Sequence, residues 1–208
     1  MYRLPAKPAQ AEFTERKSRF IGHITPVSTE QQALDFLREV RARYKDASHN
    51  VYAYHVRDGG LCRHSDDGEP SGTAGLPLLE VFTKQGVCDF CCVATRYFGG
   101  IMLGAGGLVR AYARCGAAAL EASGLAEMRL YAQGSLVCSY AQYEPLRRLL
   151  EDAGAAVTDA EFTEAVTVRF SVPGGDWDAL CAAVSAHSAG TAACRRGADA
   201  MVAKPIRI

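Results

Sequence analysis

The stretch GVCDFCCVATRYFGG, residues 86–100, decides the fold of the first half of the chain. Its interior, residues 87–95, is rich in Val, Cys, Phe and Thr and lies between glycines, which predicts a buried strand. Because side chains on a strand alternate between its two faces, Cys91 and Cys92 should point in opposite directions. Cys88 and Cys92 should share a face, but about 13 Å of extended chain separates them. That separation excludes a disulfide or a shared zinc ion, so we interpret all three cysteines as small buried hydrophobic residues.

A helix over the same residues is the alternative, and it would bring the three cysteines together as a metal or redox site. A second candidate group, His55, Cys62 and His64, does not have the spacing of the common zinc sites. The sequence therefore predicts no metal centre at either place.

Composition limits the possible functions. The chain has 208 residues, 49% of them hydrophobic, which is enough for one large domain or two small ones. Lys+Arg and Asp+Glu each number 23, so the net charge is zero, and a protein that binds DNA mainly through charge is not expected. A local basic patch remains compatible with these numbers. The N-terminal sequence lacks the apolar core of a signal peptide, and no apolar run is long enough to span a membrane, so we expect a cytoplasmic protein with reduced thiols.

The elements before the 87–95 strand alternate in type. Residues 13–27 should be extended, with Lys17 and Arg19 facing outward if Phe20 faces inward. Residues 28–31 form a capping-box pattern from Ser28 to Gln31, followed by helical spacing of apolar residues over 29–44. The alternating segment 50–57 and the segment 61–64 predict a hairpin across Asp-Gly-Gly.

The elements after residue 64 complete a mixed α/β domain and begin another. A loop over 64–77 leads into a helix over 74–84, and a second helix is expected over 106–123. The rest of the chain predicts the order βαββαβ, which is the ferredoxin-like pattern. Its strands are expected at 133–140, 155–162, 165–172 and 190–204, and its helices at 141–152 and 176–188. We therefore predict an α+β protein with domains at 1–128 and 129–208.

The loop HSDDGEPSGTAGLP, residues 64–77, concentrates acidic side chains. Asp66, Asp67 and Glu69 could hold Mg²⁺ or transfer protons. The alternative is a structural turn in which an aspartate accepts hydrogen bonds from backbone amides and caps the next helix. The residues favour the structural turn.

The segment RYFGGIMLGAGGLVRAYAR, residues 96–114, places glycines before a helix and arginines around them. Glycines there let backbone N–H groups approach an anion, although they also permit tight packing. Tyr97 and Phe98 could stack on bases. The segment has neither the P-loop motif nor the Rossmann spacing. The residues predicted to bind nucleic acid or phosphate are Lys17, Arg19, Arg96, Tyr97, Gly99, Gly100, Gly104, Gly106, Gly107, Arg110 and Arg114.

Three segments resemble the signatures of the IMPACT family in its bacterial YigZ-type form. They are KSRFIGHITPV (17–27), DDGEPSGTAGLPLLEVF (66–82) and TRYFGGIMLGAGGLVRAY (95–112). The resemblance implies that the first domain is related to the second domain of ribosomal protein S five. It also implies that the second domain is similar to domains of elongation factor G. The family's strand before TRYFGG is usually rich in valine, and cysteine there keeps the polarity and approximate size, which supports a core role.

Three functions follow as hypotheses. The favoured one is an RNA- or ribosome-associated binding protein that regulates translation, which the resemblance also implies. The alternatives are a Mg²⁺-dependent enzyme acting on a phosphorylated small molecule and a protein-interaction factor with no nucleic-acid contact. No catalytic residue and no cofactor is predicted.

Overall fold

The computed structural model describes residues 1–206, and their contacts divide the chain into two compact units. The first unit contains residues 2–128 and 203–206, and the second contains Met1 and residues 129–202. We expected the second domain to cover 129–208, whereas the contacts assign 203–206 to the first unit. Among the helices of residues 1–206, none is both long and apolar enough to cross a membrane.

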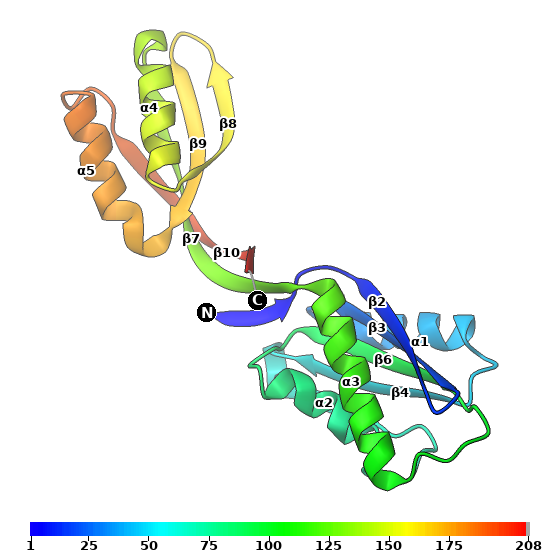
Figure 1. The fold of residues 1–208 in the computed structure, drawn as a ribbon. Coiled ribbons are helices and arrows are strands. Elements are labelled where there is room, and N and C mark those ends of the chain that lie inside the picture. Colours follow the sequence, from blue (N-terminus) through cyan, green and yellow to red (C-terminus); the bar gives the residue numbers. More distant parts are fainter. Residues whose placement is uncertain (207–208) are drawn as a thin grey trace. The chain divides into compact units, whose positions relative to one another are not determined.

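The first unit is built on a five-stranded antiparallel sheet (Figure 1). Its order is β2 (Ala9–Glu15), β3 (Ser18–Pro26), β6 (Phe90–Tyr97), β4 (His49–Val56) and β5 (Leu61–Ser65). The short 3₁₀ helix η1 (Asp58–Gly60) joins β4 to β5, as the Asp-Gly-Gly turn predicted. A separate strand, β1 (Tyr2–Pro5), pairs with residues 125–128. The mixed α/β prediction is therefore confirmed.

Strand β6 separates two hydrophobic clusters, one on each face of the sheet. Cys91 packs in the cluster of α1 (Glu30–Arg43), and Cys92 packs in the cluster of α2 (Gly75–Thr83) and α3 (Ala105–Ser123). The strand interpretation of these two cysteines is confirmed. The predicted start of the strand is wrong, because Asp89 has φ of 54° and Cys88 lies before the strand.

The start of α1 differs by one residue from the expected capping box. Thr29, not Ser28, is the N-cap, and its hydroxyl accepts a hydrogen bond from the backbone N–H of Gln32 at 3.2 Å. The Gln32 side-chain oxygen in turn accepts from the backbone N–H of Ser28 at 2.7 Å. Thr29 therefore caps the helix through its side chain, but the return bond of a capping box is missing, because Gln32 accepts from Ser28 and not from the N–H of Thr29.

The second unit is ferredoxin-like, as predicted. Its sheet has the order β10, β7, β9, β8, and α4 and α5 pack on one hydrophobic cluster with it (Figure 1). Leu146 and Leu150 of α4 and Leu180 and Val184 of α5 are buried in this cluster. The elements are β7 (Leu125–Cys138), α4 (Tyr140–Asp152), β8 (Ala156–Phe162), β9 (Val166–Pro173), η2 (Gly174–Asp176), α5 (Trp177–His187) and β10 (Cys194–Ile206).

Candidate functional site: a basic pocket beside a buried ion pair

Asp66 fixes the start of α2. One of its carboxylate oxygens accepts from the amides of Ala74 at 3.0 Å and Gly75 at 2.7 Å, and the other accepts from Gly72 at 2.9 Å. Burial alone would raise the pKa of this carboxyl, but the three amides together lower it below its usual value. Asp66 therefore has the capping role that the structural alternative predicted.

The other two acids of the loop face different partners. The Asp67 carboxylate accepts hydrogen bonds from the Arg41 guanidinium and from the backbone N–H of Asn50, both at 2.7 Å. Glu69 is buried and accepts from Arg96 at 2.5 Å. Within residues 1–206, no three His, Cys, Asp or Glu side chains come together in a group that could hold a metal ion. The acidic loop thus provides structural acceptors, and its carboxylates do not converge on a Mg²⁺ position.

Arg96 was expected to present its charge to phosphate, and this expectation is wrong. Only 4% of the residue is exposed, because it lies on central strand β6 and its guanidinium pairs with Glu69. Its second terminal nitrogen donates to Ser18 Oγ at 3.2 Å. The Tyr112 hydroxyl donates to the same Glu69 oxygen at 2.7 Å, and burial first, then the Glu69 charge, raises the pKa of that tyrosine. This buried group ties the loop to β6 and α3.

Two of the predicted glycines occupy positions where another residue would be strained, Gly99 because of close contacts and Gly104 because of its backbone conformation. A Cβ on Gly99 would lie 2.0 Å from the carbonyl carbon and oxygen of Lys17, so the chain after β6 packs directly on the β2–β3 turn. Gly104 has φ of 73° and precedes α3, and no side chain caps that helix. The first amides of α3 are therefore available to an anion.

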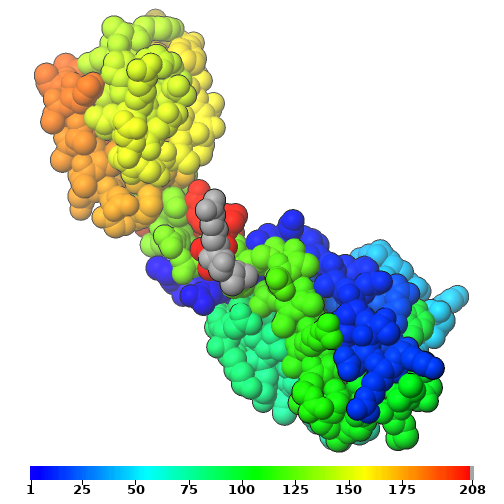
Figure 2. Space-filling model, viewed as in Figure 1, coloured from blue at the N-terminus to red at the C-terminus, as the bar shows by residue number. Residues whose placement is uncertain are grey.

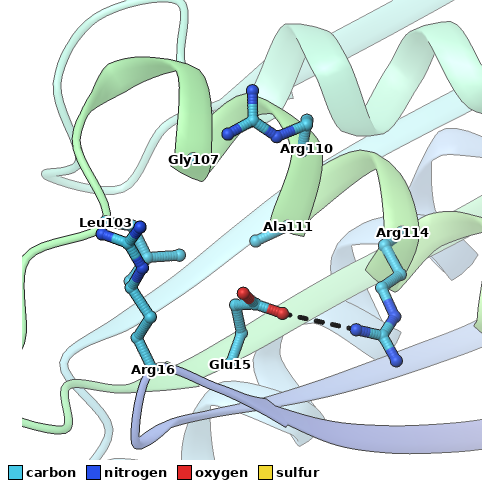
Figure 3. A pocket seen from close by; sticks show the side chains of 7 residues that line it. All are labelled: Glu15, Arg16, Leu103, Gly107, Arg110, Ala111 and Arg114. Carbon is cyan, nitrogen blue, oxygen red and sulfur yellow. Dashed lines mark hydrogen bonds and ion pairs between the residues drawn. The ribbon is translucent and has the colours of Figure 1, made fainter.

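A pocket of about 240 Å³, here called the basic pocket, lies between the β2–β3 hairpin and α3 (Figure 3). The blue hairpin and the green helix form neighbouring surface of the first unit in Figure 2. The pocket joins residues about one hundred positions apart in the sequence. Its lining residues are Glu15, Arg16, Leu103, Gly107, Arg110, Ala111 and Arg114.

The three arginines of the basic pocket differ in how they are paired. Arg114 contacts Glu15 at 3.4 Å and lies over the Phe13 ring, while Arg16 donates to the Met102 carbonyl at 3.4 Å. Arg110 has no ion pair with any residue in 1–206, and it extends from α3 back toward Gly107 (Figure 3). The pocket thus has three cations and one anion, with an excess of positive charge beside an uncapped helix N-terminus.

The remaining predicted residues lie outside the basic pocket. Lys17 is exposed on the β2–β3 turn, next to Arg16 of the pocket. Arg19 pairs with Glu12 at 2.7 Å, and the Tyr97 hydroxyl donates to Asp46 at 3.0 Å. Arg16 itself was missed; its signal is a pair of basic residues at a tight turn between two strands.

Comparison with known proteins finds two domain families in this chain. Residues 16–120 match the Impact N-terminal domain, and residues 136–191 match a domain of unknown function, DUF1949. The Escherichia coli IMPACT family member YigZ is 33% identical over 173 residues, which cover 82% of this chain and 85% of YigZ. The chain belongs to the IMPACT family.

Other relatives support the same assignment of this IMPACT protein. The Bacillus subtilis family member YvyE is 48% identical over 120 residues, so the alignment spans 57% of this chain and 55% of YvyE. A crystal structure described as that of a hypothetical protein is 31% identical, covers 93% of this chain and 95% of its own, and has a TM-score of 0.59. The Impact N-terminal domain indicated by the three sequence motifs is therefore present, and the basic pocket lies within or immediately beside it.

Proposed function

We propose that this IMPACT-family protein binds RNA on ribosomal particles through its basic pocket and thereby regulates translation. The observation that carries the proposal is Arg110, which has no ion pair among residues 1–206 and reaches toward the uncapped first turn of α3. A phosphate is the ligand that both features favour, because it accepts hydrogen bonds from helix N-terminal amides and from guanidinium groups.

The position of Arg110 is electrostatically unfavourable in the free protein. Helix N-termini carry a partial positive charge, so a cation near the first turn is repelled, by about 0.3–1 kcal/mol at an exposed site. A bound phosphate reverses the sign of both interactions. The arrangement therefore costs stability without ligand and favours an anion when one is present.

The neutral total charge requires the binding to be local. With 23 cations and 23 anions, long-range attraction to RNA is weak, and affinity must come from the pocket and its rim. Lys17 is on that rim, since it follows Arg16 in the hairpin turn.

The test is co-sedimentation with ribosomes from lysate, at low and at moderate salt, with a Lys17→Ala/Arg110→Ala double variant. The matched control is Arg38→Ala/Lys84→Ala, which removes two cations whose side chains are 70% and 73% exposed on α1 and after α2. Arg96 is left intact, because its replacement would leave the buried Glu69 carboxylate without its positively charged partner.

We expect the wild type and the control to pellet with ribosomal particles at low salt and the pocket variant to stay in the supernatant. Treatment of the lysate with ribonuclease should release the wild type. Equal pelleting of the two double variants would contradict the assignment to this pocket. A wild type that stays soluble at both salts would overturn the proposed function.

A further inference from the structure

A second cavity shares Leu103 with the basic pocket, and most of its lining residues are apolar. Its volume is about 400 Å³, within the range of about 300–1,000 Å³ that is usual for small-molecule sites. We call it the apolar pocket. Its lining residues are Glu69, Pro70, Arg96, Phe98, Met102, Leu103, Gly104, Ala105 and Leu108.

The walls of the apolar pocket include large hydrophobic side chains that are exposed. Phe98 is 51% exposed and Met102 is 80% exposed, and both belong to the loop between β6 and α3. Exposed aromatic and methionine side chains around one cavity are typical of surfaces that bind flat apolar groups. The Arg96 guanidinium lies 5.5 Å from the centre of the Phe98 ring, which is a cation–π contact.

One polar group in the lining has no partner. Arg96 donates through both terminal nitrogens, to Glu69 and Ser18, but its Nε is buried and has no hydrogen-bond partner within residues 1–206. A buried donor left unpaired is unfavourable by about 1–3 kcal/mol in general, so unsatisfied groups of this kind are rare in folded proteins. An acceptor atom on a ligand in the apolar pocket would supply the missing hydrogen bond.

We infer that the apolar pocket receives a nucleobase whose phosphate occupies the basic pocket. A base has flat faces that stack on an aromatic ring and an edge with acceptor atoms that suit the free N–H of Arg96. Both pockets have Leu103 in their lining, and the uncapped first turn of α3 contributes Ala105 to the apolar pocket and Gly107 to the basic pocket, which is the neighbourhood that a base and its own phosphate require. The inference deepens the proposed function and rests on it, because it requires RNA with unpaired bases; a free nucleotide has the same chemistry.

The test compares two probes by fluorescence anisotropy at low salt. One is a short single-stranded RNA, and the other is an abasic analogue of the same length, which keeps the phosphates and lacks the bases. The variants are Phe98→Ala, which removes the stacking ring, and Ala105→Trp, which fills the pocket from an exposed position at the start of α3. The control is Phe162→Ala in the second unit, where the phenylalanine is 52% exposed.

We expect both pocket variants to bind the base-containing RNA about five-fold or more weakly, the usual effect of losing one stacked base, and to bind the abasic probe as the wild type does. Equal wild-type affinity for the two probes, with no effect of either variant, would overturn the inference and leave phosphate binding intact.

Absence of binding to both RNA probes would instead overturn the proposed function. A thermal-shift measurement with nucleoside monophosphates then shows whether the apolar pocket binds a free nucleotide. Stabilisation of the wild type, but not of Phe98→Ala or Ala105→Trp, assigns the pocket to a free nucleotide. No stabilisation of the wild type removes the nucleobase inference as well.

Discussion

His23 is a single residue whose burial makes the stability of the first unit depend on pH. It lies on β3, is 4% exposed, and has an Nε2 atom with no hydrogen-bond partner within residues 1–206. Burial first, and then the nearby Arg43 charge, lowers its pKa from 6.5 to about 4. As the pH falls, His23 is therefore protonated near pH 6.5 in the unfolded chain but only near pH 4 in the folded protein.

We expect this residue alone to lower the free energy of unfolding as the pH falls from about 6.5 to about 4, by up to about 3 kcal/mol in total. Urea unfolding of the wild type and of His23→Leu at pH 7.5, 5.5 and 4.5 measures the effect. The variant should lose less stability on acidification, because only the wild type has the imidazole. Parallel losses in the two proteins would contradict the prediction.

Cys92 is a second residue with a defined prediction, because its side chain is fully buried and burial raises the pKa of its thiol. We expect Cys92→Val to change the free energy of unfolding by less than about 1.5 kcal/mol, since the substitution keeps an apolar side chain of similar size. Cys92→Ser serves as the comparison and should be worse by about 1–3 kcal/mol, because it buries a hydroxyl. A thiol reagent should label Cys92 only after unfolding; rapid labelling of the native protein would show that the cysteine is accessible.

Among the elements, the β2–β3 hairpin shows how stability and binding are opposed. Its turn residues Arg16 and Lys17 have φ of 43° and 64°, and positive φ at both central residues is the pattern of a type I′ hairpin turn, which Asn-Gly adopts most easily. Arg16→Asn/Lys17→Gly should therefore stabilise the protein, by about 1 kcal/mol, and weaken RNA binding through the loss of two cations. Thermal unfolding and the anisotropy assay measure the two effects.

Arg16→Gln/Lys17→Gln is the control for this prediction. It removes the same charges and keeps the strained backbone, so it should weaken binding without stabilising the fold. If both double variants bound RNA as the wild type does, the turn would have no part in binding.

Elements specified by a long apolar pattern could be predicted from the sequence, whereas features decided by a single residue or by a partner distant in the sequence could not. Strand β6 and helix α3 were predicted to within a few residues, because apolar periodicity over many residues specifies them. The first residue of β6 was not predicted, because the positive φ of Asp89 interrupts the extended chain just before the strand. The burial of Arg96 could not be predicted either, because its partner Glu69 is 27 residues away and the two side chains meet only in the folded core. The glycine-rich turn was correctly placed before α3, whereas the hairpin that completes the basic pocket is distant in sequence.

For the whole molecule, zero net charge makes the salt dependence of binding a measure of local contacts. Four cations line or rim the basic pocket: Arg16, Lys17, Arg110 and Arg114. If all four contact phosphates of single-stranded RNA, the logarithm of affinity should fall against the logarithm of salt concentration with a slope of about −3.

Lys17→Ala/Arg110→Ala should reduce that slope to about −1.4, whereas the control Arg38→Ala/Lys84→Ala should leave it unchanged. The measurement is a salt titration of RNA affinity for each protein. A wild-type slope near zero would show that phosphate contacts do not carry the binding.

The strand order of the first sheet also has a consequence for how the chain folds. The hairpins β2–β3 and β4–β5 are local, but they are neighbours only through β6, which pairs with β3 on one side and β4 on the other. During synthesis both hairpins emerge before residues 90–97, and each keeps an unpaired edge until β6 is inserted between them. We therefore expect folding of this unit to be slow and dominated by pairings distant in sequence, with the cysteine-rich strand as the segment whose arrival completes both hydrophobic cores at once.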